Sequence, residues 1–321
     1  MSRSVARRWL KPLLFLICLL LLAWMVWQAG PQQLWQTLCT LPGTIALCVL
    51  VWGVGYLLNA ASFRQVLVGM VSQASPQPQV PSYLHMLPVT IGGYALNYIT
   101  PFGLLGGEPY RVYLLRDTLG TERATQGVVL YSMMHVASHF CFWLISAVVA
   151  LFLALQPAQS TGIGRTEVLS ITALVLVCLA LLWLFWRLYR RGIALRFMRR
   201  WVDWPLLNPS LLPSAHFIRA LGLELASRLV NVIEYWLIMQ ALGYPQFGYA
   251  QALLVVAFSS LLANILFFSP LQMGTREGGI LLALQYLLSG TLLPVALTLS
   301  FATRIREFIW IGIGLLFIKR K

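Results

Sequence analysis

Long apolar runs, separated by short polar or basic stretches, follow one another along the whole chain. A helix rises ~1.5 Å per residue, so about 20 apolar residues cross the ~30 Å hydrocarbon core of a bilayer. The pattern predicts an all-α integral membrane protein with six transmembrane helices. We expect these spans at residues 13–29, 44–63, 124–155, 168–186, 215–242 and 294–318.

Two further apolar segments, 83–116 and 249–288, are interrupted near their middle. In the first, Pro101 and Pro109 break the hydrogen-bond ladder of a helix. The arms on either side of each interruption are too short to cross the bilayer, so we expect two re-entrant hairpins of broken helix. Non-helical backbone at membrane depth persists only where protein or water satisfies its polar groups. Both interruptions are therefore candidate binding sites.

The two interruptions share a short motif. Each has a hydroxyl residue before a proline, then six residues and a glutamate, with an asparagine upstream and an arginine nearby. The asparagines lie at different distances from their prolines, so the similarity is a weak internal repeat, and two unrelated kinks remain the alternative. The motif residues are Thr100, Pro101 and Glu108 in the first segment and Ser269, Pro270 and Glu277 in the second.

Basic residues gather at the ends of the apolar runs, and the positive-inside rule converts their positions into an orientation. It places both termini and the Arg-rich segment 187–200 in the cytoplasm. Residues 1–160 then hold spans 1–3 and a hairpin on the cytoplasmic side. Residues 161–321 hold spans 4–6 and a hairpin that enters from outside. We therefore predict two inverted-topology repeats, an arrangement that places the site of secondary transporters near the midplane.

Composition agrees with a membrane location. Hydrophobic residues make up 59% of the chain and charged residues only 10%, which excludes an ordinary water-soluble core. The formal charge of +14 lies in clusters at the ends of spans, so we expect no nucleic-acid partner. The location expected is a bacterial-type cytoplasmic (inner) membrane.

The fifth span carries polar residues at helical spacing. Glu224, Arg228, Asn231 and Tyr235 are four, three and four residues apart and share one stripe, with Glu234 on its flank. Charges at mid-bilayer face a bundle interior or a cavity because hydrocarbon does not solvate them. Two interpretations stay open: a lining of a polar pathway, and a closed structural pair between Glu224 and Arg228.

The sixth span adds Arg304 and Glu307 near mid-depth. A guanidinium stays charged and offers forked donors that suit a phosphate. The alternative is that Arg304 neutralises Glu277 or Glu307.

Two histidines on the third span, His135 and His139, lie one helical turn apart. This spacing suits a metal, yet no third ligand accompanies them, so we expect packing or hydrogen bonding, with proton coupling as the alternative. Phosphate-binding glycine loops, nucleophile elbows and two-Cys metal pairs are all missing from the sequence. We therefore expect no catalytic residue, no metal and no cofactor, and a protein that is not an enzyme.

The hairpin motifs resemble those of the lysylphosphatidylglycerol synthase transmembrane-region family, whose members are flippase-like integral membrane proteins. The resemblance rests on residues 97–115, with a proline, Gly-Gly-Glu and a following arginine, and on residues 270–279. It implies a lipid translocase fold with two pseudo-symmetric halves. Family members that aminoacylate lipids carry a soluble aminoacyltransferase domain, and we expect none in this protein. The implied headgroup contacts are Glu108, Arg111, Arg276 and Glu277.

These observations lead to one functional hypothesis. We expect a lipid translocase that moves an anionic or phosphate-bearing lipid, or a lipid-linked molecule, between leaflets. Its expected partners are membrane lipids, and further copies of the chain or an envelope-synthesis protein. The alternatives are a non-transporting partner of an envelope lipid or glycan synthase, a small-solute transporter and a membrane-embedded enzyme. The expected substrate contacts are Asn97, Glu108, Arg111, Arg228, Arg276, Glu277 and Arg304; the residues expected to couple or to stabilise are His135, His139, Glu224, Asn231, Glu234 and Glu307.

Overall fold

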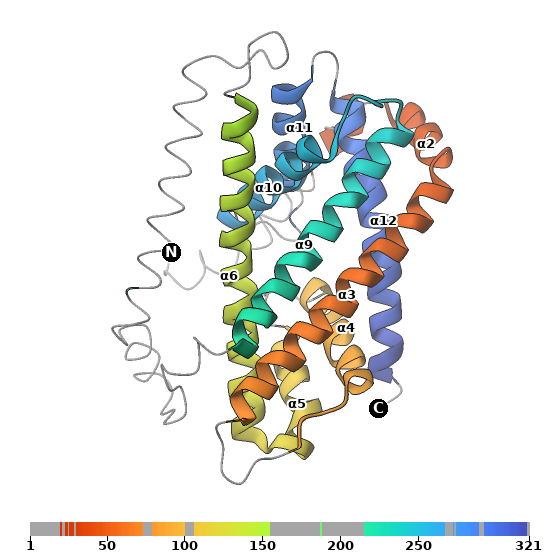
Figure 1. Cartoon of the computed structure of the whole chain (residues 1–321). Coiled ribbons are helices and arrows are strands. Elements are labelled where there is room, and N and C mark those ends of the chain that lie inside the picture. Colours follow the sequence, from red (N-terminus) through yellow and green to blue (C-terminus); the bar gives the residue numbers. More distant parts are fainter. Residues whose placement is uncertain are drawn as a thin grey trace, which may run out of the picture.

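Helices account for all the secondary structure in the described part of the chain (Figure 1). The computed structural model describes residues 20, 23–24, 26–28, 30–72, 79–99, 106–154, 187, 215–266, 272, 274–288 and 292–319. Its helices are α2 (Pro31–Cys39), α3 (Pro42–Val71), α4 (Tyr83–Ile99), α5 (Glu108–Leu119), α6 (Thr121–Ala154), α9 (Ala215–Ala241), α10 (Tyr249–Ile265), α11 (Thr275–Leu287) and α12 (Leu293–Lys319). The predicted all-α class is confirmed.

Four of the predicted spans correspond to the long helices α3, α6, α9 and α12. Helix α3 continues to Val71, beyond the expected end at residue 63. Arg64 was expected to end the span, but its Nε donates to the carbonyl of Pro81 at 3.1 Å, so its charge is accommodated within the helix. Helix α2 was not predicted; it begins at Pro31, which suits a first helical position. The predicted span 168–186, most of 13–29 and both motif prolines lie outside the described residues.

Among the described residues, two helices combine enough length and hydropathy to cross a membrane: α3 and residues 121–153 of α6. Helices α9 and α12 are each 27 residues long, or about 40 Å. Both are long enough to span, and both carry several charged residues within the helix. Most of these charges face inward, as described below, whereas Arg219 and Lys319 are exposed.

Each interrupted segment consists of two separate helices. The first pair is α4 and α5, and the second is α10 and α11. From the prolines and glycines of the interruptions, the second arms were expected to begin at Tyr110 and Gly278; they begin earlier, at Glu108 and Thr275. Both motif glutamates therefore lie in the first turn of a helix. Pro109 does not break α5, because a proline in the first turn forfeits no intrahelical hydrogen bond.

Helices α3 and α9 run antiparallel in close contact, side by side in Figure 1. Two reciprocal hydrogen bonds join them: Ser62 Oγ donates to Ala220 O at 2.9 Å, and Ser227 Oγ donates to Gly55 O at 3.1 Å. A Cβ added at Gly55 would lie 2.6 Å from Asn231 Oδ1. Small residues therefore set the separation of these helices, as in many membrane bundles.

The remaining helices pack around this pair in matched sets. Helix α4 contacts α12, and α10 contacts α6; α6 contacts α9, and α12 contacts α3. The pair α4 and α5 lies at one end of the bundle, and the pair α10 and α11 lies toward the other (Figure 1). The contacts among these helices therefore form matching pairs when α3, α4, α5 and α6 are compared with α9, α10, α11 and α12, whereas the contact of α2 with α12 has no counterpart among the described helices.

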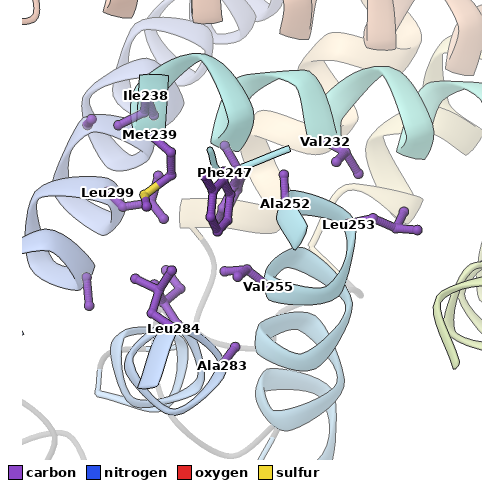
Figure 2. Packing of buried hydrophobic residues seen from close by; sticks show 14 of the residues in the cluster. Val232, Ile238, Met239, Phe247, Ala252, Leu253, Val255, Ala283, Leu284 and Leu299 are labelled. Carbon is purple, nitrogen blue, oxygen red and sulfur yellow. The ribbon is translucent and has the colours of Figure 1, made fainter. Parts of the chain in front are cut away.

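Two apolar cores support the hairpins. One surrounds Phe63, Leu115 and Tyr131 at the α4 and α5 end. The other gathers around Phe247, with Met239 and Leu284 nearby, where α9, α10, α11 and α12 meet (Figure 2). Each hairpin is therefore held against long helices by close-packed apolar side chains.

The distribution of exposed and buried residues is that of a membrane bundle. Large apolar side chains face outward, among them Leu50 at 67% exposure and Phe308 at 68%, whereas Glu234 and Arg306 are 0% exposed. Water favours the opposite arrangement, with charges outside and few large apolar side chains exposed. Hydrocarbon favours this one, because buried charges then pair with one another.

Candidate functional site

The charged side chains inside the bundle form two clusters, one beside each hairpin. The first charge cluster consists of Glu108, Arg111, His135, His139, Glu224 and Arg228, from α5, α6 and α9. The second charge cluster consists of Glu234, Arg276, Glu277, Arg304, Arg306 and Glu307, from α9, α11 and α12.

The start of α5 brings the first hairpin's charges together. Arg111 Nη1 donates to Glu108 Oε1 at 3.0 Å, as suits two residues three apart on one helix. The Arg111 guanidinium also lies over the rings of Tyr94 and Tyr131, 4.8 and 5.5 Å from their centroids. The Arg111 side chain is only 3% exposed, so its charge depends on these contacts.

The hairpin closes through backbone contacts that require glycine. Gly107 N donates to Asn97 Oδ1 at 2.6 Å, so Asn97 holds the break closed at the beginning of α5. A Cβ added at Gly107 would lie 2.0 Å from the carbonyl oxygen of Gly93 on α4. Helices α4 and α5 therefore approach each other more closely than any side chain at this position would allow.

Facing these residues, α6 and α9 form a second layer of the first charge cluster. His135 Nδ1 lies 2.8 Å from Glu224 Oε2, and the Glu224 side chain is 1% exposed. Arg228 donates through Nε to Ser138 Oγ at 2.7 Å, and its Nη1 lies 3.0 Å from His139 Nδ1. The closed Glu224 to Arg228 pair was therefore the wrong pairing, because each of the two side chains turns toward α6.

The second charge cluster closes the second hairpin. Arg304 donates to Glu277 Oε1 through Nε at 3.0 Å and through Nη2 at 2.7 Å. Ser300 Oγ donates to the same oxygen at 2.7 Å, while Gly274 N donates to Glu277 Oε2 at 2.8 Å. Of the two partners considered for Arg304, the structure places Glu277 against it.

Arg276 joins the hairpin to α12 and α9. Its Nη1 donates to Glu307 Oε1, and its Nη2 donates to Thr303 Oγ1 at 2.9 Å and to the Tyr235 hydroxyl at 3.3 Å. Tyr235 belongs to the stripe predicted on α9, which therefore reaches both clusters. The remaining residue of the stripe, Asn231, lies against Gly55 of α3 and joins neither cluster.

Arg306 and Glu234 form a buried, forked ion pair between α12 and α9. Arg306 Nε and Nη2 donate to the two carboxylate oxygens, each at 2.8 Å. The guanidinium carbon lies 3.4 Å from the ring centroid of Trp52 on α3. Sequence reasoning did not assign Arg306 to the site, although a charged residue within a span was itself a signal.

Aromatic side chains connect the two clusters. Tyr56 of α3 lies 5.5 Å from the ring of Tyr94, which covers Arg111. It also lies 6.4 Å from Trp52, which covers Arg306. The rings of Tyr94, Tyr56 and Trp52 thus form a continuous row between Arg111 of the first cluster and Arg306 of the second.

The clusters differ in how far their hydrogen bonds are satisfied. In the first, Arg111 Nε and Nη2, Glu108 Oε2 and Glu224 Oε1 are buried and have no hydrogen-bond partner among the described residues. In the second, Arg306 Nη1 is the one such atom found in the described residues, and Glu307 Oε1 lies 3.8 Å from it. Buried polar atoms are nearly always paired, so the unpaired atoms mark a place for a polar ligand or water.

The described residues contain no group of three potential metal ligands, and no third ligand joins His135 and His139. Other residues of the site had not been predicted, chiefly Tyr94, Ser132, Ser300 and Thr303, since isolated hydroxyl residues within apolar runs carry no distinctive signal. An apolar groove elsewhere, between α9 and α10, is lined by Leu229, Val230, Ile233, Trp236 and Tyr249.

A helical bundle with an apolar exterior and paired charges inside is a membrane protein. Residues 9–314 match the model of the family described as the lysylphosphatidylglycerol synthase TM region. The chain belongs to this family, and the resemblance seen in the hairpin motifs is confirmed. A search of curated proteins and a search of solved structures gave no match. Family membership supports a function related to membrane lipids.

Proposed function

We propose that this protein is a lipid translocase that moves an anionic or phosphate-bearing lipid, or a lipid-linked molecule, between the two leaflets. The observation that carries the proposal is the pair of buried charge clusters, each at the start of the second arm of a broken segment. Charges at this depth are expensive in hydrocarbon, and in membrane proteins they mark substrate or ion pathways. The lipid's acyl chains stay in the bilayer while its headgroup passes these clusters.

Internal symmetry supports a site of this kind. Ser62 and Ser227 make reciprocal bonds, and the spacing between these serines equals that between Gly55 and Ala220. A serine of the following long helix reaches each motif glutamate: Ser132 bonds Glu108, 24 residues away, and Ser300 bonds Glu277, 23 residues away. Because the related helices α3 and α9 are antiparallel, the axis that relates the halves is perpendicular to them. These features favour two inverted repeats that alternate in exposure.

The first charge cluster has the chemistry to receive a phosphate-bearing headgroup. The unpartnered Arg111 Nε and Nη2 are donors that suit phosphate oxygens. The unpartnered Glu108 Oε2 and Glu224 Oε1 are acceptors for hydroxyl or ammonium groups of the same headgroup. The remaining parts of the proposal are an inner-membrane location with both termini in the cytoplasm and a lipid that leaves chemically unchanged.

A second candidate is a non-transporting partner subunit of an envelope lipid or glycan synthase. The second charge cluster favours it, because all three of its glutamates are already bound by arginines. A closed cluster of this kind holds helices together without a substrate. In the translocase proposal, the second cluster is the one whose charges are satisfied within the protein, and the first cluster, with its unpartnered polar atoms, is the one that binds the headgroup.

Liposomes containing the purified protein test the proposal with fluorescent phosphatidylglycerol, phosphatidic acid and phosphatidylcholine. We expect movement of at least one phosphate-bearing anionic lipid out of the quencher-accessible leaflet, faster than in protein-free liposomes. Mass spectrometry of the recovered lipid should show no change of mass. Equal rates with and without protein for every lipid would favour the partner subunit, and an altered mass would favour an enzyme.

A further inference from the structure

We propose that His135 and Glu224 form a proton-binding site, and that translocation is coupled to the uptake and release of one proton there. The proposal rests on the lipid translocase function and adds an energy source to it. It starts from the geometry of α6 and α9, where His135 Nδ1 lies 2.8 Å from Glu224 Oε2.

The hydrogen bonds around the pair fix where a proton resides. Arginine only donates, so the contact of Arg228 Nη1 with His139 Nδ1 makes that nitrogen an acceptor and His139 a neutral ring. His135 Nδ1 lies closer to Glu224 Oε2, at 2.8 Å, than to Arg228 Nη2, at 3.5 Å, so it carries a proton when Glu224 is ionised. An additional proton binds at the buried, unpartnered Glu224 Oε1, because Arg228 Nη2 lies 3.4 Å from His135 Nε2 and would oppose a second donor there.

The charge balance of the first cluster explains why a proton would be needed. Two arginines, Arg111 and Arg228, face two glutamates, Glu108 and Glu224, so the cluster has no net charge when both histidines are neutral. An anionic headgroup that entered it would bring an uncompensated negative charge into a buried site, which is unfavourable. One proton on the pair restores neutrality. The anion and the proton therefore enter together and leave together, and no other bond forms or breaks.

A row of hydroxyl groups leads toward the pair. The Tyr94 hydroxyl lies 3.2 Å from His135 Nδ1 and 3.0 Å from the Tyr131 hydroxyl. On the same helix, Ser132 Oγ lies 3.5 Å from Glu108 Oε1, at the start of α5. Ser132 and His135 are three residues apart on α6, so the pair lies about one helical turn from this contact with the start of α5, where a headgroup would enter. The titratable and charged groups around His135 come from four helices. They are Tyr94 of α4, Arg111 of α5, Tyr131 and His139 of α6, and Glu224 and Arg228 of α9. From α3 and α10, Phe63 stacks on Tyr131 and Ser260 accepts from Trp143, and neither of these two groups titrates.

The second charge cluster lacks an equivalent site. On α12, Thr303 and Glu307 follow Ser300 at the spacings at which His135 and His139 follow Ser132 on α6. Each glutamate of that cluster faces an arginine, which does not give up its proton. Of the four histidines in the chain, His85 and His216 lie near helix ends outside both clusters. Proton exchange is thereby confined to one half.

Histidine NMR of the full-length protein in lipid nanodiscs decides whether the pair binds a proton. Four ring signals are expected, and His135→Gln and His216→Gln assign two of them. Over a titration from pH 8 to pH 4, we expect the His135 signal to shift as the pair takes up a proton. Glu224→Gln should alter that titration, while His216→Gln, at a histidine bonded to Gln65, should leave it unchanged. A His135 signal that stays constant over this range would overturn the proposal.

Liposomes with an imposed pH gradient then test the coupling, using fluorescent phosphatidylglycerol. We expect the gradient to accelerate movement severalfold in the parent and in His216→Gln, and to have no effect in His135→Gln or Glu224→Gln. If the parent moved lipid at the same rate with and without the pH gradient, proton coupling would be overturned, whereas the translocase proposal would stand. A protein whose His135 titrates but that moves no lipid of the panel would count against the translocase and against coupling, while proton binding would stand.

Discussion

Replacement of Arg306 with methionine is expected to lower the free energy of unfolding by about 3–5 kcal/mol, which is typical of removing one member of a buried ion pair. The Arg306 side chain is 1% exposed and donates to both oxygens of Glu234, whose side chain is 0% exposed. Without Arg306 the carboxylate keeps its desolvation cost and loses its forked partner. The stacking over Trp52 is lost as well. Thermal unfolding in detergent micelles measures the change.

Two matched variants separate the loss of the pair from the loss of a charge. Arg116→Met removes an arginine whose side chain is 46% exposed on α5, and we expect a change of at most about 1 kcal/mol. The double variant Glu234→Leu, Arg306→Met replaces the pair with apolar side chains and should recover most of the lost stability. An Arg306→Met protein as stable as the parent would show that the pair does not hold α9 against α12.

Replacement of Gly107 with alanine is expected to open the first hairpin and to abolish lipid movement. The added Cβ would lie 2.0 Å from Gly93 O and 2.9 Å from Gly93 Cα, so α4 and α5 must separate. Overpacking of this kind typically costs about 1–3 kcal/mol. Separation also breaks the 2.6 Å bond from Gly107 N to Asn97 and displaces Glu108, the next residue. The thermal midpoint and the rate of lipid movement both measure the effect.

The backbone of Gly107 does not itself require glycine, since its φ of −88° is open to alanine. The expected effect therefore comes from steric contact alone. Gly222→Ala on α9 is the matched control, because an added Cβ there meets nothing within 4 Å. Alanine favours helix over glycine, so this variant should be as stable as the parent or slightly more stable. Equal behaviour of the two variants would contradict the close approach of α4 and α5.

The sequence predicted the helices well because length and hydropathy decide where a membrane helix lies. The apolar runs that became α6, α9 and α12 were placed within a few residues of their observed ends. Helix α2 was missed because it has only nine residues, several of them polar. The start of α5 was misplaced because Pro109 was taken as a break, whereas a proline in the first turn favours a helix.

Pairing among the charged residues was much harder to predict. The Glu108 to Arg111 pair follows from a spacing of three residues on one helix. The pairs of Arg276 with Glu307 and of Arg306 with Glu234 join different helices, 31 and 72 residues apart in the chain. Several arginines and glutamates are chemically equivalent candidates, and the rotation of each helix about its axis decides between them. That rotation depends on packing, which no local pattern encodes.

The roles of individual site residues depend on the same information. Asn97 was expected to contact the headgroup, and the structure places its side chain on Gly107 N. His135 and His139 were expected to pack or to form hydrogen bonds, and both contact polar groups of α9. The spacing on α6 put both histidines on one face, but only the position of α9 brings Glu224 to one and Arg228 to the other.

The central claim is that the two motif glutamates serve one lipid pathway, and the initial rate of lipid movement in liposomes tests it most directly. The comparison is between the parent, the double variant Glu108→Gln, Glu277→Gln, and Asp117→Asn, which neutralises a carboxylate that is 87% exposed on α5. Size-exclusion profiles establish that each protein is folded. We predict that Asp117→Asn keeps the parent rate and that the double variant loses at least about tenfold, or ~1.4 kcal/mol of barrier. A folded double variant that moves lipid at the parent rate would contradict the account.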